Sequence, residues 1–163
     1  MKETLIKTRI TVYPVIELPE KYKLLYDSAS NAAMDAYAPY SGFQVGAAVL
    51  LDDGTIVCGN NQENAAYPSG LCAERVALFY AGAQYPDIPV KAIAIAAFSE
   101  GQQVAHVSPC GSCRQVLLET ENRFRKPIRV ILCGTEEVGI IESAASLLPV
   151  GFDGCDLVLS TGK

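Results

Sequence analysis

The second half of the sequence alternates apolar runs with a helical pattern, and this alternation is the strongest constraint on its fold. Residues 92–98 form a continuous apolar run of the kind found in strands buried on both faces, and residues 128–133 form a second buried strand. Between them, residues 110–122 have the apolar spacing of a helix. The order strand, helix, strand predicts a layered α/β fold whose sheet carries helices on both faces.

The rest of the sequence supplies further elements. The spacing of Leu25, Ala29 and Ala33 predicts an amphipathic helix over residues 20–37. The turn at Asp53-Gly54 lies between two apolar runs and predicts a hairpin of strands 45–51 and 55–59. We also expect a strand over 5–16, a loop over 60–71, a short strand over 139–142 and a brief helix capped by Ser143. A helix is expected over 72–82; it would bury Val76, Ala77 and Phe79 and end at Gly82.

Length and composition favour a single core. The chain has 163 residues, of which 50% are hydrophobic and 19% charged, and this is enough to fold without disulfide staples. We expect one domain over residues 18–163, preceded by a strand-like N-terminal extension over residues 1–17. The extension either adds an edge strand to the sheet or covers a subunit surface.

Charge and residue usage exclude several kinds of function. Thirteen Lys and Arg against eighteen Asp and Glu give a net charge of −5, which argues against binding a nucleic-acid backbone. A single His excludes mechanisms that need two imidazoles. The first residues lack the pattern of a signal peptide, and no apolar stretch reaches the roughly 18 residues of a membrane span. We therefore expect a cytoplasmic protein without a membrane partner. In a reducing compartment, clusters among its six cysteines are expected to act as ligands or catalysts rather than to form disulfides.

Three of these cysteines stand at the starts of two predicted helices. Cys110 and Cys113 are three residues apart, so their sulfurs share one helix face, and a helix N-terminus favours the thiolate. A third thiolate from Cys72 would leave one position of a tetrahedral zinc site open to water, as in catalytic zinc sites. Glu74, two residues after Cys72, is close enough to exchange a proton with that water without being a ligand.

Simpler interpretations exist for each part of this pattern. Cys110 and Cys113 alone fit a redox pair or half of a structural zinc site, and Cys72 beside Glu74 is unremarkable by itself. A redox pair, however, leaves Cys72 and Glu74 without a role, and a structural site lacks an obvious fourth ligand. Taken together, Cys-Ala-Glu and Pro-Cys-x-x-Cys match the signature of zinc deaminases in its three-cysteine form.

Several sequence blocks resemble the small tetrameric cytidine deaminases. The two zinc motifs are Cys72-Ala73-Glu74-Arg75 and Ser108-Pro109-Cys110-Gly111-Ser112-Cys113-Arg114-Gln115. The segment 59–67, with Asn61, Glu63 and Asn64, is similar to the nucleoside-binding segment of that family. The opening block over 36–48 and the C-terminal block around Leu147-Leu148-Pro149 and Phe152 are also similar, and all blocks occur in the family's order.

The resemblance implies a complete active site. Zinc, one ion per chain, would be bound by Cys72, Cys110 and Cys113, with Glu74 as the proton shuttle and Arg75 as the residue that offsets the negative charge of the thiolates. The substrate would be a free nucleoside, and water the second reactant. The residues implied to contact the nucleoside are Asn61 and Glu63 at the sugar 3′-hydroxyl, Phe43 against the pyrimidine, Tyr67 in the pocket wall, Ala73 through its backbone, and Phe152 across a subunit boundary.

The same resemblance implies a three-layer α/β/α sandwich with a five-stranded mixed sheet, assembled as a homotetramer. The implied reaction is hydrolytic deamination of cytidine and deoxycytidine in pyrimidine salvage. Without the resemblance, Phe43 is equally a core residue, Asn61 and Glu63 are ordinary turn and surface residues, and Arg75 is a solvated helix residue. Cys58 and Cys133 are expected to be thiols of the strand core, and His106 a structural or loop residue.

Three other functions remain open. Nucleic-acid and nucleotide deaminases share the chemistry but need a basic groove or a phosphate site, which this acidic chain does not show. A deaminase of a cytosine-nucleoside antibiotic, of the blasticidin type, shares both zinc motifs, although Asn61 and Glu63 favour an ordinary ribose. A zinc or redox module without catalysis would use the same cysteines.

Overall fold

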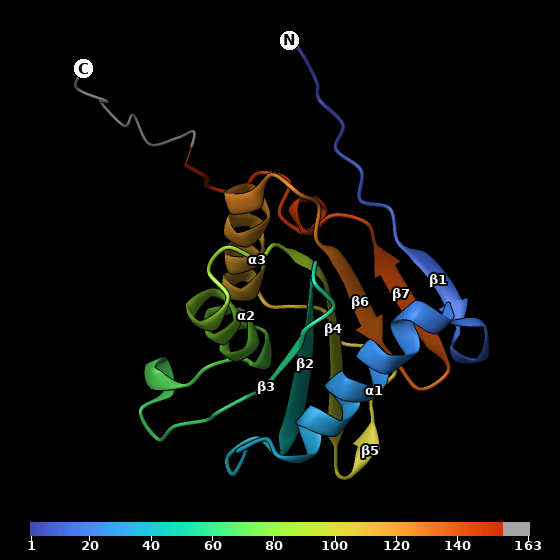
Figure 1. Ribbon diagram of the computed structural model, residues 1–163, viewed down its shortest axis with the longest axis vertical. Helices are drawn as coiled ribbons and strands as arrows, with labels where there is room; N and C mark the ends of the chain where they lie inside the picture. Colours follow the sequence, from blue (N-terminus) through green and yellow to red (C-terminus); the bar gives the residue numbers. More distant parts are fainter. Residues whose placement is uncertain (155–163) are drawn as a thin grey trace.

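The central feature of the fold is a mixed β-sheet (Figure 1), seen in a computed structural model that describes residues 1–154. The strands follow the order β1-β7-β6-β4-β2-β3, with the short β5 paired to β4. Among these strands of the described residues, β4 and β6 are parallel neighbours and the other pairs are antiparallel. The strands are β1 (Thr11–Pro14), β2 (Phe43–Leu51), β3 (Ile56–Asn60), β4 (Val90–Ser99), β5 (Gln102–Gln103), β6 (Arg129–Cys133) and β7 (Glu137–Ile141).

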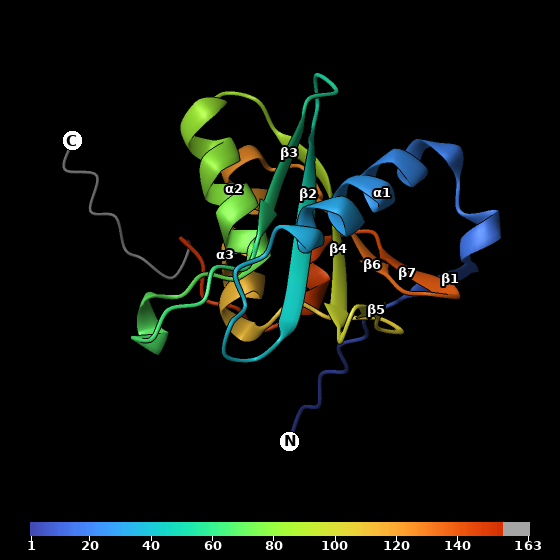
Figure 2. The same cartoon turned by 90° about the horizontal axis from the view of Figure 1, so that it is seen from below.

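Helices lie on both faces of the sheet (Figure 2). Helix α1 (Glu20–Met34) packs over one face, where Leu25 and Ala29 join a core with Ile131 and other residues of the central strands. Helices α2 (Ala73–Gln84) and α3 (Gly111–Phe124) pack over the other face through a second core, which includes Ala77 and Leu117. Short 3-10 turns occur at η1 (Val15–Glu17), η2 (Tyr67–Ser69) and η3 (Ala144–Leu147).

Two glycines allow the helices to approach the sheet closely. A Cβ on Gly46 of β2 would lie 2.0 Å from the carbonyl oxygen of Ala29 in α1. A Cβ on Gly59 of β3 would lie 2.6 Å from the backbone nitrogen of Ala77 in α2. Both distances are well inside van der Waals contact, so any side chain at these positions would push a helix away from the sheet.

The strand directions explain why two helix starts meet. Strands β3 and β4 are both antiparallel to β2, which lies between them. Their carboxyl ends therefore lie on the same side of the sheet. The chain reaches α2 after β3 and reaches α3 after β4. The N-termini of both helices therefore lie near the carboxyl ends of these strands, where open α/β sheets commonly bind ligands.

The N-terminal extension adds an edge strand, which confirms one of its two expected roles. Residues 11–14 of β1 pair with β7, in a register that joins Thr11 to Ile140 and Pro14 to Glu137. Just before β1, the hydroxyl of Thr8 donates a hydrogen bond to the carbonyl of Ser146 across 2.6 Å. The strand is shorter than the expected 5–16 because residues 1–10 have no strand partner.

The α/β class and the helices on both faces are as expected, but the five-strand count is wrong. The sheet has seven strands, because β1 extends the edge beyond β7 and two residues of β5 pair with the end of β4. The hairpin, the helices and the buried strands lie at the expected positions with small shifts at their ends.

Several side chains differ from expectation. On α2, Ala77 is buried but Phe79 is 51% exposed, because the helix turns that side chain away from the sheet, and the helix continues past Gly82 to Gln84. Cys133 is buried as expected, whereas Cys58 is exposed on the edge strand β3. Ser143 precedes η3, but its hydroxyl binds Glu121 instead of capping the turn.

In the part of the chain that the structure describes, no helix is both long enough and apolar enough to cross a bilayer. His106 lies exposed in the loop between β5 and α3, as expected for a loop residue.

Candidate metal centre and active site

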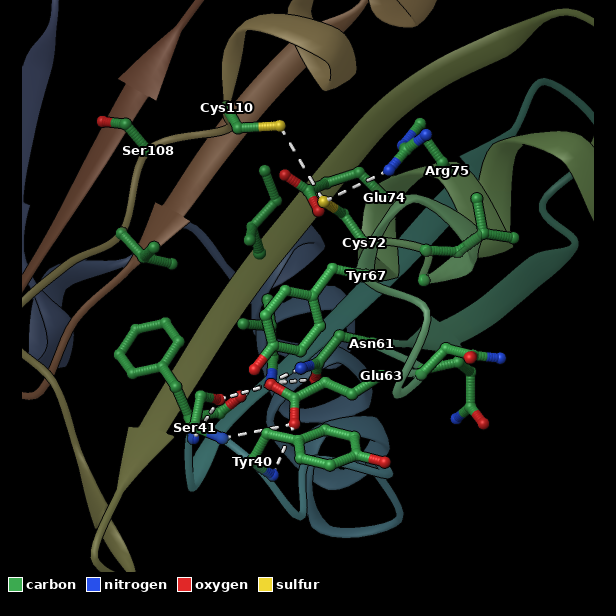
Figure 3. A pocket seen from close by; sticks show the side chains of 18 residues that line it. Tyr40, Ser41, Asn61, Glu63, Tyr67, Cys72, Glu74, Arg75, Ser108 and Cys110 are labelled. Atoms are coloured by element: carbon green, nitrogen blue, oxygen red, sulfur yellow. Dashed lines mark hydrogen bonds between the residues drawn. The ribbon is translucent and has the colours of Figure 1, made fainter.

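Three thiols from two helix starts converge where strands β3 and β4 end. Figure 3 shows two of them, Cys72 and Cys110. Cys72 immediately precedes α2, Cys110 immediately precedes α3, and Cys113 lies in the first turn of α3. The sulfur of Cys110 is 3.8 Å from that of Cys72 and 3.5 Å from that of Cys113. The structure thus brings together all three predicted ligands, with every sulfur within 4.8 Å of the others.

The spacing of these thiols fits zinc. A Zn–S bond is about 2.3 Å, so tetrahedral ligation places sulfurs about 3.8 Å apart. The observed separations of 3.8 and 3.5 Å match this requirement without a large movement. Among the described residues, no fourth His, Cys, Asp or Glu joins the group, so a bound ion would keep one position for water, as in catalytic zinc sites. The three-cysteine cluster therefore fits one Zn²⁺ per chain.

The surroundings of Cys72 favour its thiolate form. Hydrogen bonding from the Cys113 thiol lowers the pKa of Cys72 to about 5, and Arg75, whose guanidinium nitrogen lies 3.7 Å from the Cys72 sulfur, acts in the same direction. The same contact with Cys72 raises the pKa of Cys113, which keeps the shared proton. Zinc binds thiolates, so a site that already holds a thiolate at Cys72 is prepared for the ion.

Glu74 lies beside the thiols but is not part of their cluster. Its residue is only 4% exposed, and burial raises the pKa of its carboxyl group. In Figure 3 the carboxylate points toward the sulfurs of Cys72 and Cys110. A carboxylate with a raised pKa accepts a proton more readily than an ordinary carboxylate, and accepting and returning a proton is what a proton shuttle requires.

Cys72, Cys110 and Glu74 line a cavity of about 630 Å³, and Cys113 is buried beside them. Its size suits a small organic molecule. The apolar part of its lining comes from Phe43, Val45, Leu71, Ile95 and Val107. The end away from the sulfurs is polar and contains Asn61, Glu63 and Ser41 (Figure 3). The cavity therefore offers one end to a reacting group, apolar walls to a flat ring, and a polar end to hydroxyls.

Asn61 is fixed by the strand beside it. Its side-chain oxygen accepts a hydrogen bond from the backbone nitrogen of Val45 at 2.7 Å, and its amide nitrogen donates to the carbonyl of Phe43 at 2.9 Å. These bonds hold the amide in one orientation at the cavity wall. One N–H and one oxygen lone pair of the side chain remain for a ligand.

Glu63 closes the turn that precedes β2. It accepts hydrogen bonds from the backbone nitrogen of Tyr40 at 2.8 Å and from the hydroxyl of Ser41 at 2.5 Å. The bond from Ser41, followed by that from Tyr40, holds the pKa of Glu63 below its usual value. The carboxylate therefore stays ionised at the cavity rim, and a carboxylate can accept a further hydrogen bond there.

The other predicted contact residues lie in different positions. Phe43 and Tyr67 line the cavity, and Tyr67, 75% exposed, packs edge-on against Tyr40 with ring centroids 6.0 Å apart. Ala73 is fully buried at the start of α2. Phe152 is 58% exposed and does not line this cavity in its own chain.

Two residues that the sequence analysis did not single out, Ser41 and Arg114, hold other parts of the site in place. Ser41 holds the carboxylate of Glu63, and Arg114 binds the carbonyl oxygens of Pro109 and Leu147 at 2.8 and 3.2 Å. Both stand within the recognised blocks, which is the one signal that marks them. Their partners are distant in sequence, so spacing alone does not reveal these contacts.

Comparison with known proteins agrees with this geometry. Residues 19–126 match the family model described as the cytidine and deoxycytidylate deaminase zinc-binding region. A cytidine deaminase from Sporosarcina psychrophila is 44% identical over 135 residues, which cover 83% of this chain and 93% of that protein.

Solved structures are similar as well. The crystal structure of cytidine deaminase from Burkholderia pseudomallei has a TM-score of 0.66 at 40% identity, covering 79% of this chain and 97% of that one. Cytidine deaminase from Mycobacterium tuberculosis has a TM-score of 0.66 at 33% identity, covering 83% and 99%. Given the matched family model, the relatives and the cluster of thiols beside Glu74, the chain belongs to the cytidine and deoxycytidylate deaminase family.

Proposed function

We propose that this protein catalyses the zinc-dependent hydrolytic deamination of cytidine and deoxycytidine to uridine and deoxyuridine, with release of ammonia. The observation that carries the proposal is the arrangement of one cavity. Two thiols of the three-cysteine cluster, Cys72 and Cys110, lie with the buried Glu74 at one end, and Asn61 and Glu63 lie at the other. The apolar part of the lining suits a pyrimidine ring. The reaction belongs to pyrimidine salvage.

Glu74 carries the protons of this reaction. When bound, zinc supplies Lewis-acid activation of the attacking water. Glu74 accepts a proton from that water and delivers it to N3 of the pyrimidine, while the oxygen forms a bond to C4. Glu74 then transfers the second proton of the water to the 4-amino group, the C4–N bond breaks, and ammonia leaves as the C4 carbonyl forms. Burial, which raises the pKa of Glu74, suits both directions of transfer.

The remaining residues bind and orient the nucleoside. Asn61 and Glu63 would hold the sugar 3′-hydroxyl through the hydrogen-bonding capacity that their internal contacts leave free. Phe43 would pack against the base, Tyr67 would close the pocket wall, and the backbone at Ala73 would contact the base. Arg75 would offset the charge of the thiolates.

The charges around the cavity favour a nucleoside over a nucleotide. Within residues 1–154, Arg75 is the one basic residue that lines the cavity, and it contacts Cys72 at the metal end. Glu63 at the sugar end is negative and would repel a 5′-phosphate. We therefore assign cytidine and deoxycytidine as substrates in preference to their phosphates.

The protein is further proposed to be a cytoplasmic homotetramer. Its reduced thiol cluster suits a reducing compartment. Exposed aromatic side chains, among them Phe79, Tyr80 and Phe152, are candidates for subunit contacts. In such an assembly Phe152 would stack near the base bound by a neighbouring subunit. The domain would be a three-layer sandwich that spans residues 18–163. Residues 155–163 of this range lie outside the described residues.

The test measures ammonia release and zinc content of the same preparation. Cytidine, deoxycytidine, their 5′-monophosphates and blasticidin are compared at equal concentrations. Turnover of the two nucleosides with one zinc per chain supports the proposal. Faster turnover of a monophosphate or of blasticidin would reassign the substrate, and a zinc-loaded protein without turnover would contradict an enzymatic role.

A further inference from the structure

Cys110 is the ligand of the metal centre with the least support from packing. Cys113 is completely buried within α3, and Cys72 is half-buried with a hydrogen bond from Arg75. Cys110, by contrast, is exposed. Something other than the packing of its side chain must fix its position, because a zinc ligand displaced by even a fraction of an ångström weakens the site.

Arg114 holds the backbone on both sides of Cys110. Its side-chain Nε donates a hydrogen bond to the carbonyl of Pro109 at 2.8 Å, and its backbone nitrogen donates to the carbonyl of Cys110 at 2.9 Å. These carbonyls belong to the peptide planes before and after the Cα atom of Cys110. Fixing both planes fixes the φ and ψ angles of this residue, and with them the direction of its Cα–Cβ bond.

The same guanidinium reaches a second part of the chain. A terminal nitrogen of Arg114 donates to the carbonyl of Leu147 at 3.2 Å. The next residue, Gln115, donates from its side chain to the carbonyl of Phe152 at 2.7 Å. Two consecutive residues of α3 thus connect the metal-binding loop to residues 144–152, which we call the C-terminal segment.

We infer that Arg114 is the positioning residue for the ligand Cys110, and that it fixes this ligand by bracing the metal-binding loop against the C-terminal segment. The inference deepens the proposed function, since it rests on the three thiols holding zinc. A guanidinium presents donors from separate nitrogens of one rigid plane, whereas an ammonium presents all its donors from a single nitrogen on a flexible stem. The role therefore calls for Arg specifically.

The experiment measures zinc dissociation from the full-length zinc-loaded protein into an excess of a chromogenic chelator. The test variant is Arg114→Met, which keeps the aliphatic stem and removes both side-chain donors. The matched control is Arg123→Met, because Arg123 lies on the same helix and also donates to a backbone carbonyl, that of Pro86 at 2.6 Å, away from the thiols. Urea unfolding of each zinc-free variant records any general loss of stability.

We expect Arg114→Met to release zinc about 10- to 100-fold faster, as is typical when the residue that orients a metal ligand is removed, and Arg123→Met to behave like the wild type. Equal zinc release from both variants would overturn the inference, since it would show only a general effect on α3. If Arg114→Met does not fold, Arg114→Lys serves instead: faster zinc release supports the inference, and release at the wild-type rate overturns it.

The outcome also separates this inference from the proposed function. A wild-type protein that binds zinc and deaminates cytidine, with unchanged zinc release in the Arg114 variants, overturns only the role of Arg114. A wild-type protein that binds no zinc overturns both.

Discussion

The guanidinium of Arg75 donates a hydrogen bond to the sulfur of Cys72 across 3.7 Å. The contact places a positive charge beside a cluster of three thiols. Three thiolates and Zn²⁺ together carry a charge of −1, from three negative charges and two positive ones, and this excess weakens the metal as a Lewis acid. In the proposed role Arg75 would withdraw part of that charge, so its effect should appear in catalysis more than in zinc binding.

Arg75→Gln should lower kcat/KM by about 10- to 100-fold, the usual range for residues that tune a metal ligand. Zinc content at saturating zinc should stay at one ion per chain. Steady-state kinetics and metal analysis of the same sample test both parts, with Arg123→Gln as a control for the loss of a positive charge. Activity within about twofold of the wild type would show that Arg75 has no electrostatic role.

Glu74→Gln should keep zinc and nearly abolish turnover. Gln has the shape of Glu but cannot exchange protons, and a positioned proton-transfer group typically contributes about 10²- to 10⁴-fold. The measurement is ammonia release with a zinc assay, and Glu119→Gln, an exposed substitution on α3, is the control. Substantial residual activity in a zinc-loaded Glu74→Gln protein would contradict its assignment as proton shuttle.

Ser41→Ala should shift the pH dependence of nucleoside binding. The hydroxyl of Ser41 holds the pKa of Glu63 below its usual value, so its removal raises that pKa. Binding through the Glu63 carboxylate is present above the pKa and is lost as the pH falls through it. In Ser41→Ala this loss should therefore begin at a higher pH than in the parent.

The binding assay uses uridine, whose base does not titrate in the acid range, and a Glu74→Gln background, so that Glu74 makes no contribution. Ser28→Ala is the control, since the Ser28 hydroxyl bonds only within α1 to the carbonyl of Leu24. Identical pH profiles for the Ser41 variant and its parent would argue against a role of Glu63 in binding the sugar.

Glu121→Ala should destabilise the fold without touching the cavity. The buried carboxylate accepts hydrogen bonds from the backbone nitrogens of Ile128 and Ala144, each at 2.8 Å, and from the Ser143 hydroxyl at 2.6 Å. Removing it leaves buried donors unsatisfied, at a cost of about 3 kcal/mol in the free energy of unfolding. Urea unfolding measures the loss, and Glu119→Ala on the exposed face should stay within about 0.5 kcal/mol of the wild type.

Local sequence patterns predict most of the helices and strands, and they also predict the three cysteines of the metal centre. The hairpin of β2 and β3 follows from its Asp-Gly turn, and the metal ligands follow from cysteines at helix starts. In both cases the informative residues lie within a few positions of each other, where spacing translates directly into geometry.

Local sequence patterns do not predict which distant segments come into contact in the folded chain. The helical spacing of apolar residues in α2 does not show how wide the buried face of the helix is. The prediction that Phe79 is buried was therefore wrong, since this residue is 51% exposed. Cys58 was expected in the core because it lies in an apolar strand, but β3 ends the sheet and leaves that thiol exposed. The bonds from Arg114 to Leu147 and from Ser41 to Glu63 join segments that only the folded chain brings together.

The pairing of β1 with β7 has a consequence for colloidal behaviour. An open strand edge is a template on which other chains can add, and proteins often protect it with a short strand or with proline. Here the outermost strand has only four residues and ends at Pro14, which has no N–H to donate. A chain that begins after residue 17 would expose the edge of β7 instead. The short strand β1 therefore covers the edge of β7 and is itself a poor template for further pairing.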